Sequence, residues 1–205
     1  MCGRFVITSP PAALRLMFGY VEQPNFPPRH NIAPTQPVPV VTVEHGARHF
    51  RLMRWGLIPA WVKDPRKITL MINARAEGLA ESWMGPNGEE LDTVAIVTAA
   101  ASRDLAVLHQ RVPIAIRDED FVRWLDCSSD SAADVMGLLA PPEIGEFTWH
   151  EVSTRVNHAD NDDAQLILPI TDGQRAAEDA PKPVKRAARR KTSPPVVDDG
   201  QGKLF

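Results

Sequence analysis

Cys2 is the residue of this chain with the most distinctive reactive chemistry. It has a small side chain and follows Met1, so we expect removal of Met1 to leave Cys2 at the amino terminus. A terminal cysteine carries a thiol that titrates near ~8.5 and an α-amine that titrates near ~7.7–8.0, on adjacent carbons. The amine can form an imine with an aldehyde, and the sulfur can then close a thiazolidine ring. An ordinary cysteine after the initiator methionine is the alternative interpretation.

The composition indicates a soluble globular protein. The chain has 205 residues, of which 43% are hydrophobic and 24% charged, and it has no apolar run that could cross a bilayer. Cys2 and Cys127 are the only cysteines, too few for a disulfide framework or a zinc site, so we expect a cytoplasmic protein. Cys127 is interpreted as structural. We expect no cofactor, no metal, no contact with a membrane, and a monomer.

The residues that surround Cys2 must be positioned by a fold of many short elements. Strands are expected at 5–8, 38–43, 49–55, 93–98, 113–116 and 149–156, and helices after Ser9 and at 102–108 and 118–125. Residues 24–37 are expected to form an extended loop. The pattern predicts an α+β domain over residues 1–171, closer to a β-barrel than to a doubly wound sheet. From 172 to 205 the apolar periodicity stops, which predicts a disordered basic tail.

Four segments together resemble the SOS-response-associated peptidase (SRAP) family, the abasic-site-processing proteins. They are Met1-Cys2-Gly3-Arg4-Phe5, Arg54-Trp55-Gly56-Leu57-Ile58-Pro59, Asn73-Ala74-Arg75-Ala76-Glu77 and His109-Gln110-Arg111-Val112-Pro113, and supporting matches are Asn31-Ile32-Ala33-Pro34-Thr35 and Val152-Ser153-Thr154-Arg155-Val156-Asn157. Six such segments in the right order are hard to obtain by chance. The resemblance implies an SRAP-like fold. It also implies a cytosolic, nucleoid-associated sensor of abasic sites in single-stranded DNA that crosslinks itself to the sugar aldehyde through Cys2.

The resemblance, together with side-chain chemistry, indicates three catalytic residues beside Cys2. Asn73 can hydrogen-bond the reacting sugar oxygen or the α-amine, with a structural asparagine as the alternative. His109 can protonate the departing ring oxygen and assist ring closure or reversal, because imidazole exchanges protons near neutral pH. Thr98 lies in a matching position at a strand end, where its hydroxyl can hydrogen-bond the sugar.

Contacts with DNA are expected from two kinds of side chain. Guanidinium groups suit phosphate oxygens, and three arginines flank the proposed catalytic residues: Arg4, Arg75 and Arg111. Flat apolar side chains on loops suit stacking on the bases beside a lesion, and the candidates are Pro34, Trp55 and Trp61. For Trp55, packing in the core is the alternative. Recognition should therefore depend on backbone charge, stacking and the missing base, with little reading of sequence.

The chain departs from the family pattern after Glu77. The family has a long segment there, with a Cys-Leu-Ile-Pro-like strand and a Phe-Tyr-Glu-Trp-like motif that supplies a catalytic glutamate. In this chain Glu77 runs directly into Gly78-Leu79-Ala80-Glu81-Ser82-Trp83, and neither Glu77 nor Glu81 matches that motif. We expect at least two strands to be lost, which leaves the barrel incomplete. Crosslinking should be slower or less reversible, because loss of one acid–base group typically costs ~10²–10⁴ in rate.

The last five residues suggest a further partner. Gln201-Gly202-Lys203-Leu204-Phe205 resembles the short peptides by which bacterial repair proteins dock on the replication sliding clamp. A flexible tail would present Leu204 and Phe205 as two apolar anchors beside Gln201. The basic residues between 185 and 191 could add salt-dependent affinity for DNA.

Three other functions are compatible with the sequence. The missing segment is consistent with a degenerate, non-catalytic paralogue that binds single-stranded DNA. Met-Cys-Gly also opens the N-terminal-nucleophile amidohydrolases, although the other motifs do not fit that class. The family name suggests a thiol peptidase, whose supported form is self-cleavage that exposes Cys2, together with reversal of the crosslink. An enzyme of the peptidase or lyase type is therefore expected.

Overall fold

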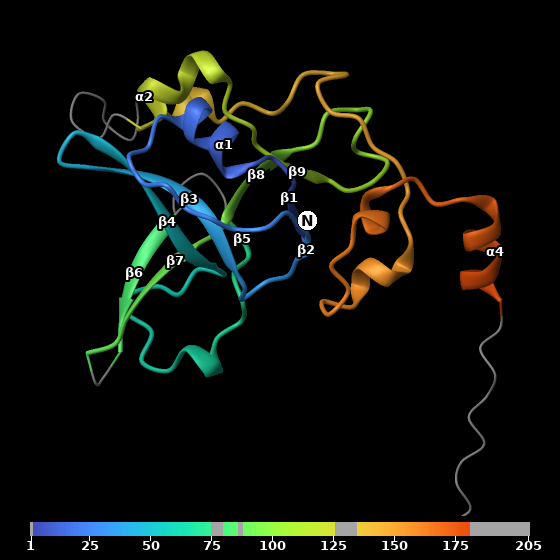
Figure 1. The fold of residues 1–205 in the computed structure, drawn as a ribbon, viewed down its shortest axis with the longest axis horizontal. Helices are drawn as coiled ribbons and strands as arrows, with labels where there is room; N and C mark the ends of the chain where they lie inside the picture. The colour runs from blue at the N-terminus through green and yellow to red at the C-terminus, as the bar shows by residue number, and fades with distance from the viewer. Residues whose placement is uncertain (1, 75–79, 86–87, 126–134, 181–205) are drawn as a thin grey trace, which may run out of the picture.

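The computed structural model describes residues 2–74, 80–85, 88–125 and 135–180. These residues form an α+β fold of short strands with a few helices, as predicted (Figure 1). The described strands belong to three sheets, with strand orders β1-β2, β3-β4-β7-β6 and β5-β8-β9. None of these three sheets closes on itself within the described residues, in agreement with the expectation of an incomplete barrel.

A long hairpin forms the larger sheet. Strand β3 (Pro37–Glu44) pairs antiparallel with β4 (Ala47–Trp55) along its whole length. The two turn residues, His45 and Gly46, have φ values of 51° and 79°, as a two-residue hairpin turn requires. The predicted hairpin over 38–55 is therefore confirmed.

Two further strands extend this sheet beyond β4. Strand β7 (Glu90–Val94) runs parallel to the end of β4, and β6 (Ala80–Met84) pairs antiparallel with β7. The chain leaves β4 at Gly56, where φ is +130° and an added Cβ would lie 2.5 Å from Leu70 Cδ1. Glycine is the residue that fits such a position, because its backbone reaches this φ without a side-chain clash.

The small three-stranded sheet places most of the predicted site. Its strands are β5 (Asn73–Ala74), β8 (Ile96–Ala100) and β9 (Arg111–Pro113), with β5 parallel and β9 antiparallel to β8. The strand predicted at 93–98 is wrong as one unit. It divides at the buried Ala95, because Val94 still pairs in the larger sheet whereas Ile96 already pairs with β5. The strand predicted at 113–116 is also wrong beyond its first residue, because β9 ends at Pro113 and residues 114–116 are irregular.

The N-terminal segment forms a third, two-stranded sheet. Strand β1 (Phe5–Ile7) pairs antiparallel with β2 (Arg29–Ile32), so the predicted loop at 24–37 contains a strand. Helix α1 (Pro11–Phe18) follows β1 as expected. Its last residue, Phe18, contacts Phe121 of helix α2 (Phe121–Leu125) with ring centroids 5.1 Å apart, which places the two helices together above the strands (Figure 1).

Two buried apolar clusters hold these elements together. The larger one joins the N-terminal strands to the hairpin, and its fully buried members are Ile7, Ile32, Val38 and Trp55. The smaller one anchors the loop after β4 to strand β6 through Ile58, Val62 and Trp83. Both clusters combine residues far apart in sequence, so the site strands are positioned by long-range packing.

Several turns are single-turn 3-10 helices. They are η1 (Pro65–Lys67), η2 (Asp118–Asp120), η3 (Met136–Leu138), η4 (Thr154–Asn157) and η5 (Ala164–Ile167). The helix predicted at 102–108 is a succession of turns, in which Leu105 alone is buried. The strand predicted at 149–156 is also wrong, because the Ser153 hydroxyl accepts from the backbone N–H of Arg155 and turns the chain into η4.

The tail predicted from residue 172 begins instead with a helix. Helix α4 (Asp172–Asp179) starts at Thr171, whose side chain forms a capping box with Gln174. The Glu178 carboxylate accepts from the Ser153 hydroxyl and from the backbone N–H of Thr154. Polar contacts therefore order this segment, whereas the prediction considered only apolar periodicity. Residues 181–205 lie outside the described residues.

Candidate active site at the N-terminal cysteine

Cys2 and Asn73 lie in contact although 71 positions separate them. The side-chain amide nitrogen of Asn73 donates to the backbone carbonyl of Cys2 at 3.2 Å. The amide oxygen of Asn73 is buried and has no hydrogen-bond partner among the described residues. A buried acceptor without a partner is unfavourable. This oxygen is therefore suited to accept a hydrogen bond from a group that reaches the site.

The thiol of Cys2 is half-buried and free. Burial raises the pKa of the Cys2 thiol above its ordinary value, and the positive charge of the amino terminus acts in the opposite direction. Because the net direction is upward, the sulfur is mostly protonated at neutral pH. A reaction at this sulfur therefore needs a group that accepts its proton.

Thr98 ties the three strands of the small sheet together. Its side chain is buried, and its hydroxyl donates to the carbonyl of Ala74 at 3.3 Å and accepts from Nε of Arg111 at 2.9 Å. A second nitrogen of the Arg111 guanidinium donates to the Thr98 carbonyl. The hydroxyl thus has a donor and an acceptor already, which gives Thr98 a positioning role between β5 and β9.

His109 lies at the open end of this sheet, two residues before Arg111. Its side chain is exposed, and its Nδ1 accepts from the backbone N–H of Arg111 at 3.0 Å. The same nitrogen lies 3.2 Å from the carbonyl oxygen of Arg111, whereas no hydrogen bond is recorded for Nε2 among the described residues. A chain of hydrogen bonds runs from His109 through Arg111 and Thr98 to the strand that carries Asn73. The structure records no direct contact of His109 with Cys2 or Asn73.

Arg4 fixes the N-terminal segment against the C-terminal part of the domain. Its guanidinium donates to the carbonyls of Val156 at 3.0 Å, Asn157 at 2.8 Å and Gly3 at 2.8 Å. Three of its five N–H groups are used in this way. Arg4 therefore positions the residues next to Cys2, and its remaining N–H groups are available to a phosphate.

The three predicted stacking residues have different exposures. Trp55 is 1% exposed, and its indole N–H donates to the Ile72 carbonyl at 2.9 Å. The prediction that Trp55 stacks on DNA bases is therefore wrong, because the hydrophobic packing of the core takes the whole ring. Trp61 is 77% exposed on the loop after β4, and Pro34 is half-buried. Arg75, Gln201, Leu204 and Phe205 lie outside the described residues, as do Glu77 and Cys127.

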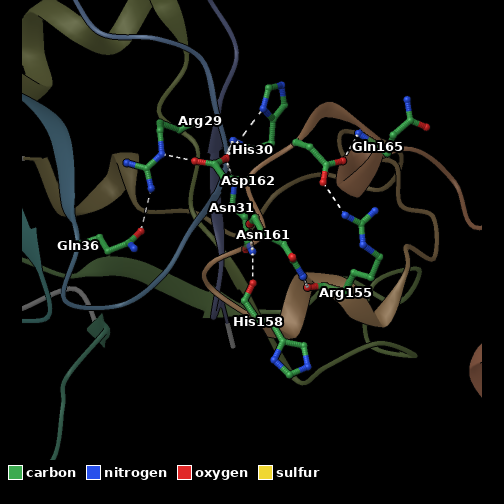
Figure 2. Close-up of polar contacts among 10 residues, drawn as sticks. Arg29, His30, Asn31, Gln36, Arg155, His158, Asn161, Asp162 and Gln165 are labelled. Atoms are coloured by element: carbon green, nitrogen blue, oxygen red, sulfur yellow. Dashed lines mark hydrogen bonds and ion pairs between the residues drawn. The ribbon is translucent and has the colours of Figure 1, made fainter.

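A second polar cluster, which the sequence did not predict, joins β2 to the turn at 158–163 (Figure 2). The Asp162 carboxylate accepts from the Arg29 side chain and from the backbone N–H groups of His30 and Asn31. The buried Asn31 amide donates to the carbonyls of His158 and Asn161. The available signal was that Asn31 lies in one family-matching segment and that the polar residues 158–163 directly follow another, which ends at Asn157.

Burial favours the neutral form of Asp162, but the hydrogen bonds it accepts outweigh that effect. Those from the His30 N–H and the Arg29 guanidinium, with the positive charge of Arg29, leave the pKa of Asp162 below its ordinary value. Asp162 is therefore ionised wherever the domain is folded at neutral pH. Its charge therefore helps to hold the turn at 158–163 on β2. Val156 and Asn157, whose carbonyls accept from Arg4, directly precede this turn.

Within the described residues, no group of three or more His, Cys, Asp or Glu side chains is arranged to hold a metal ion. No helix of the described part of the chain is long and apolar enough to span a membrane. The groups of the chain with useful chemistry at this site include the thiol of Cys2, the amide of Asn73 and the imidazole of His109.

One family model matches the chain. The model described as "SOS response associated peptidase (SRAP)" matches residues 1–84 and 78–159. The two matches overlap at residues 78–84, next to the point where the sequence departs from the family pattern.

Several curated relatives have names that describe one process. Abasic site processing protein YoqW of Bacillus subtilis is 25% identical over 221 residues, which cover 82% of this chain and 99% of YoqW. Abasic site processing protein HMCES of Gallus gallus is 35% identical over 116 residues, covering 56% of this chain and 32% of HMCES. The alignment with YoqW is longer than this 205-residue chain. The chain therefore lacks residues that YoqW contains.

Solved structures share the fold. A protein of Bacteroides thetaiotaomicron superposes with a TM-score of 0.69 at 16% identity, covering 83% of this chain and all of that protein. A protein of Bordetella bronchiseptica superposes with a TM-score of 0.54 at 15% identity, covering 69% of this chain and 95% of that protein. At such low identity these likenesses concern the fold alone.

Proposed function

The chain belongs to the SOS response associated peptidase family, and on this premise we propose that it captures abasic sites in single-stranded DNA through Cys2. The names of relatives such as YoqW and HMCES support this choice of substrate. An abasic deoxyribose in its ring-opened form is an aldehyde. A terminal cysteine is the residue that can trap an aldehyde with two neighbouring nucleophiles, once Met1 has been removed.

The proposed reaction proceeds in two balanced steps. The α-amine of Cys2 adds to the aldehyde carbon, and loss of one water leaves an imine. The sulfur then adds to the imine carbon, a C–S bond forms, and the thiol proton moves to the nitrogen. The imine nitrogen accepts the proton that the sulfur must release, so the second step needs no other base. The product is a thiazolidine that links the protein to the DNA.

Two side chains have roles in these steps. The unpartnered oxygen of Asn73 accepts a hydrogen bond from the Cys2 amine or a sugar hydroxyl, and its nitrogen holds the Cys2 backbone in place. His109 donates a proton to the ring oxygen of the closed sugar as it opens to the aldehyde, before these two steps, and later assists reversal. The contact between Asn73 and Cys2 is the single observation that carries the proposal, because it joins two family motifs in one site.

Binding of the DNA strand requires charge and stacking near this site. The exposed indole of Trp61 and the ring of Pro34 offer surfaces for bases, at ~1–3 kcal/mol for each stacked base. Arg75 and the unused N–H groups of Arg4 and Arg111 are the proposed phosphate contacts. The protein would thereby shield the lesion from strand scission at a stalled replication fork.

A denaturing gel with the full chain tests the chemistry. A single-stranded oligonucleotide with one abasic site should give a shifted covalent band with the processed wild-type chain. Cys2→Ala should abolish the band, and a variant that retains a residue ahead of Cys2 should do the same, because its amine is displaced. Cys127→Ala, the matched cysteine variant, should retain it. A band that persists in Cys2→Ala overturns the proposed nucleophile.

One observation favours a second function. The chain is shorter than its alignment with YoqW, so a catalytic group can have been lost with the missing residues. A non-catalytic protein that binds single-stranded DNA is the corresponding alternative. It predicts retention of the oligonucleotide in a native gel and no covalent band at any time.

A further inference from the structure

An apolar cavity of about 420 Å³ opens beside Cys2. Its walls include the rings of Phe5, Pro113 and Trp124 together with the side chain of Leu139, and the polar residues that reach it are Cys2 and Arg4. Most of these side chains are only half-buried, although they are apolar. An apolar face is thus left open directly next to the proposed reactive group.

The open apolar surface extends beyond this cavity. A neighbouring apolar groove of about 650 Å³ shares Phe5 and Trp124 with the cavity and continues between helices α1 and α2 and strand β3. Apolar surface that stays in contact with water is unfavourable by roughly 25 cal/mol per Å². The apolar wall beside Cys2 and the groove that continues from it therefore offer a surface to a bound apolar group.

The chemistry of the cavity suits one class of occupant. Its volume lies in the range of small-molecule sites, and its flat rings suit a planar aromatic group. Arg4 also lines the cavity, and the N–H groups of its guanidinium that do not donate to Gly3, Val156 or Asn157 suit a phosphate attached to that group. A planar base linked to a phosphate is a nucleotide, and the cavity adjoins Cys2, where the proposed function places the reacting sugar. A base beside an abasic sugar has also lost one stacking partner, so it leaves the stack at low cost.

We propose that this cavity is a subsite for the nucleobase adjacent to the abasic sugar, with Trp124 and Phe5 as its stacking walls. The inference rests on the proposed function, since it assumes that the abasic sugar lies at Cys2. The subsite accepts the base on one side of the lesion, the 5′ or the 3′ side. The rate of crosslinking should therefore depend on whether that base is present and hardly on which base it is, because apolar side chains form no base-specific hydrogen bonds.

A fluorescence experiment tests binding without the covalent step. The full chain is titrated into a single-stranded oligonucleotide with a non-reactive tetrahydrofuran abasic analogue and 2-aminopurine on its 5′ or 3′ side. We expect quenching at saturation for one of the two sides. Leu139→Trp, which fills the cavity, should abolish most of this quenching, whereas the volume-matched Leu139→Met should retain it. Leu52→Trp, which adds the same ring at an exposed position of β4 outside the cavity, should retain the quenching.

A covalent experiment tests the consequence for capture. Replacing the base on the same side of a reactive abasic site by tetrahydrofuran should slow crosslinking by the wild-type chain about tenfold, as expected for loss of one stacked base. Leu139→Trp should crosslink at the slower rate with either oligonucleotide.

Three outcomes would overturn the subsite: quenching that Leu139→Trp leaves intact, a wild-type crosslinking rate that is independent of both neighbouring bases, or a wild-type chain that quenches neither probe. Absence of any crosslink would instead contradict the proposed reaction, and the fluorescence experiment would still decide on the cavity. Urea unfolding of Leu139→Trp and Leu139→Met confirms that both variants are folded.

Discussion

Asn73 uses the two ends of one side chain for different purposes. Its nitrogen donates to the Cys2 carbonyl, and its oxygen remains buried without a partner among the described residues. By contrast, the Thr98 hydroxyl already has a donor and an acceptor. The two predicted residues therefore differ in what they can offer a substrate, although both lie in the small sheet.

Asn73→Asp tests the role of the nitrogen. The carboxylate keeps the shape of the side chain but presents an acceptor to the Cys2 carbonyl, so the hydrogen bond is replaced by repulsion. We expect crosslinking to abasic oligonucleotide to slow by roughly two- to tenfold, since one hydrogen bond contributes roughly 0.5–1.5 kcal/mol. The reaction of Cys2 with a small free aldehyde, measured by mass spectrometry, should change little.

Asn161→Asp is the matched control for this prediction. The Asn161 amide also donates to a backbone carbonyl, that of Arg155 at 2.8 Å, but on the surface and away from Cys2. Its crosslinking rate should equal that of the wild type. Equal rates for Asn73→Asp and the wild type would show that the contact with Cys2 has no part in capture.

At the scale of elements, the register of β5, β8 and β9 depends on a buried hydroxyl. Thr98 joins Ala74 on one neighbouring strand to Arg111 on the other. Because β5 and β9 are only two and three residues long, backbone pairing alone gives them little stability. The side-chain contacts of Thr98 supplement it.

Thr98→Val should therefore destabilise the domain by about 1–3 kcal/mol, because Arg111 Nε loses its acceptor at a buried position. Urea unfolding measures this difference. Thr42→Val, in strand β3, is the matched control. The hydrogen bond recorded for the Thr42 hydroxyl joins it to the carboxylate of Glu44 at 3.2 Å, within its own strand. Similar losses in both variants would contradict the assignment of Thr98 as a link between strands.

The turn at 158–163 is held on β2 by a charge. Asp162 accepts three hydrogen bonds from Arg29, His30 and Asn31 (Figure 2). The pKa of Asp162 is lowered in the folded state despite its partial burial. A lowered folded pKa contributes stability that is present above the unfolded pKa and is lost as pH falls through the folded pKa.

Asp162→Asn should consequently destabilise the domain at about pH 6 and less so at about pH 2.5, since Asp in unfolded chains titrates near ~3.9. Urea unfolding of both proteins at the two pH values gives the comparison. Asp163→Asn is a matched neighbour, whose carboxylate pairs with Arg155 at the surface, and its effect should be smaller at both pH values. A difference between Asp162→Asn and the wild type that grows on acidification would contradict this linkage.

At the scale of the whole molecule, the domain and the last residues should act independently. We propose that Gln201, Leu204 and Phe205 dock on the replication sliding clamp and thereby bring the abasic-site chemistry to replication forks. Leu204→Ala with Phe205→Ala should abolish binding to the clamp in a pull-down or by surface plasmon resonance. The rate of crosslinking to free oligonucleotide should remain that of the wild type.

Val196→Ala with Val197→Ala is the matched control in the same segment, since it removes a comparable apolar surface. This variant should keep its affinity for the clamp. Unchanged clamp binding in the Leu204/Phe205 variant would exclude the motif, whatever the outcome of the crosslinking experiments.

The sequence alone predicted the features that depend on local chemistry. Strand β1, helix α1 and the β3–β4 hairpin follow from β-branched runs, helix-starting prolines and turn residues at known offsets. The reactive character of Cys2 is likewise a property of its type and position. Family motifs also indicated Asn73 as a neighbour of Cys2, and the structure contains that contact.

Only the tertiary structure decided which side chains remain available. Trp55 and Trp61 lie six residues apart and have the same type, yet one is 1% and the other 77% exposed. The Asp162 cluster joins residues more than 130 positions apart, and α4 is ordered by contacts with Glu151, Ser153 and Thr154. Burial and hydrogen-bond pairing between distant segments depend on how the sheets pack, and no local pattern encodes that packing.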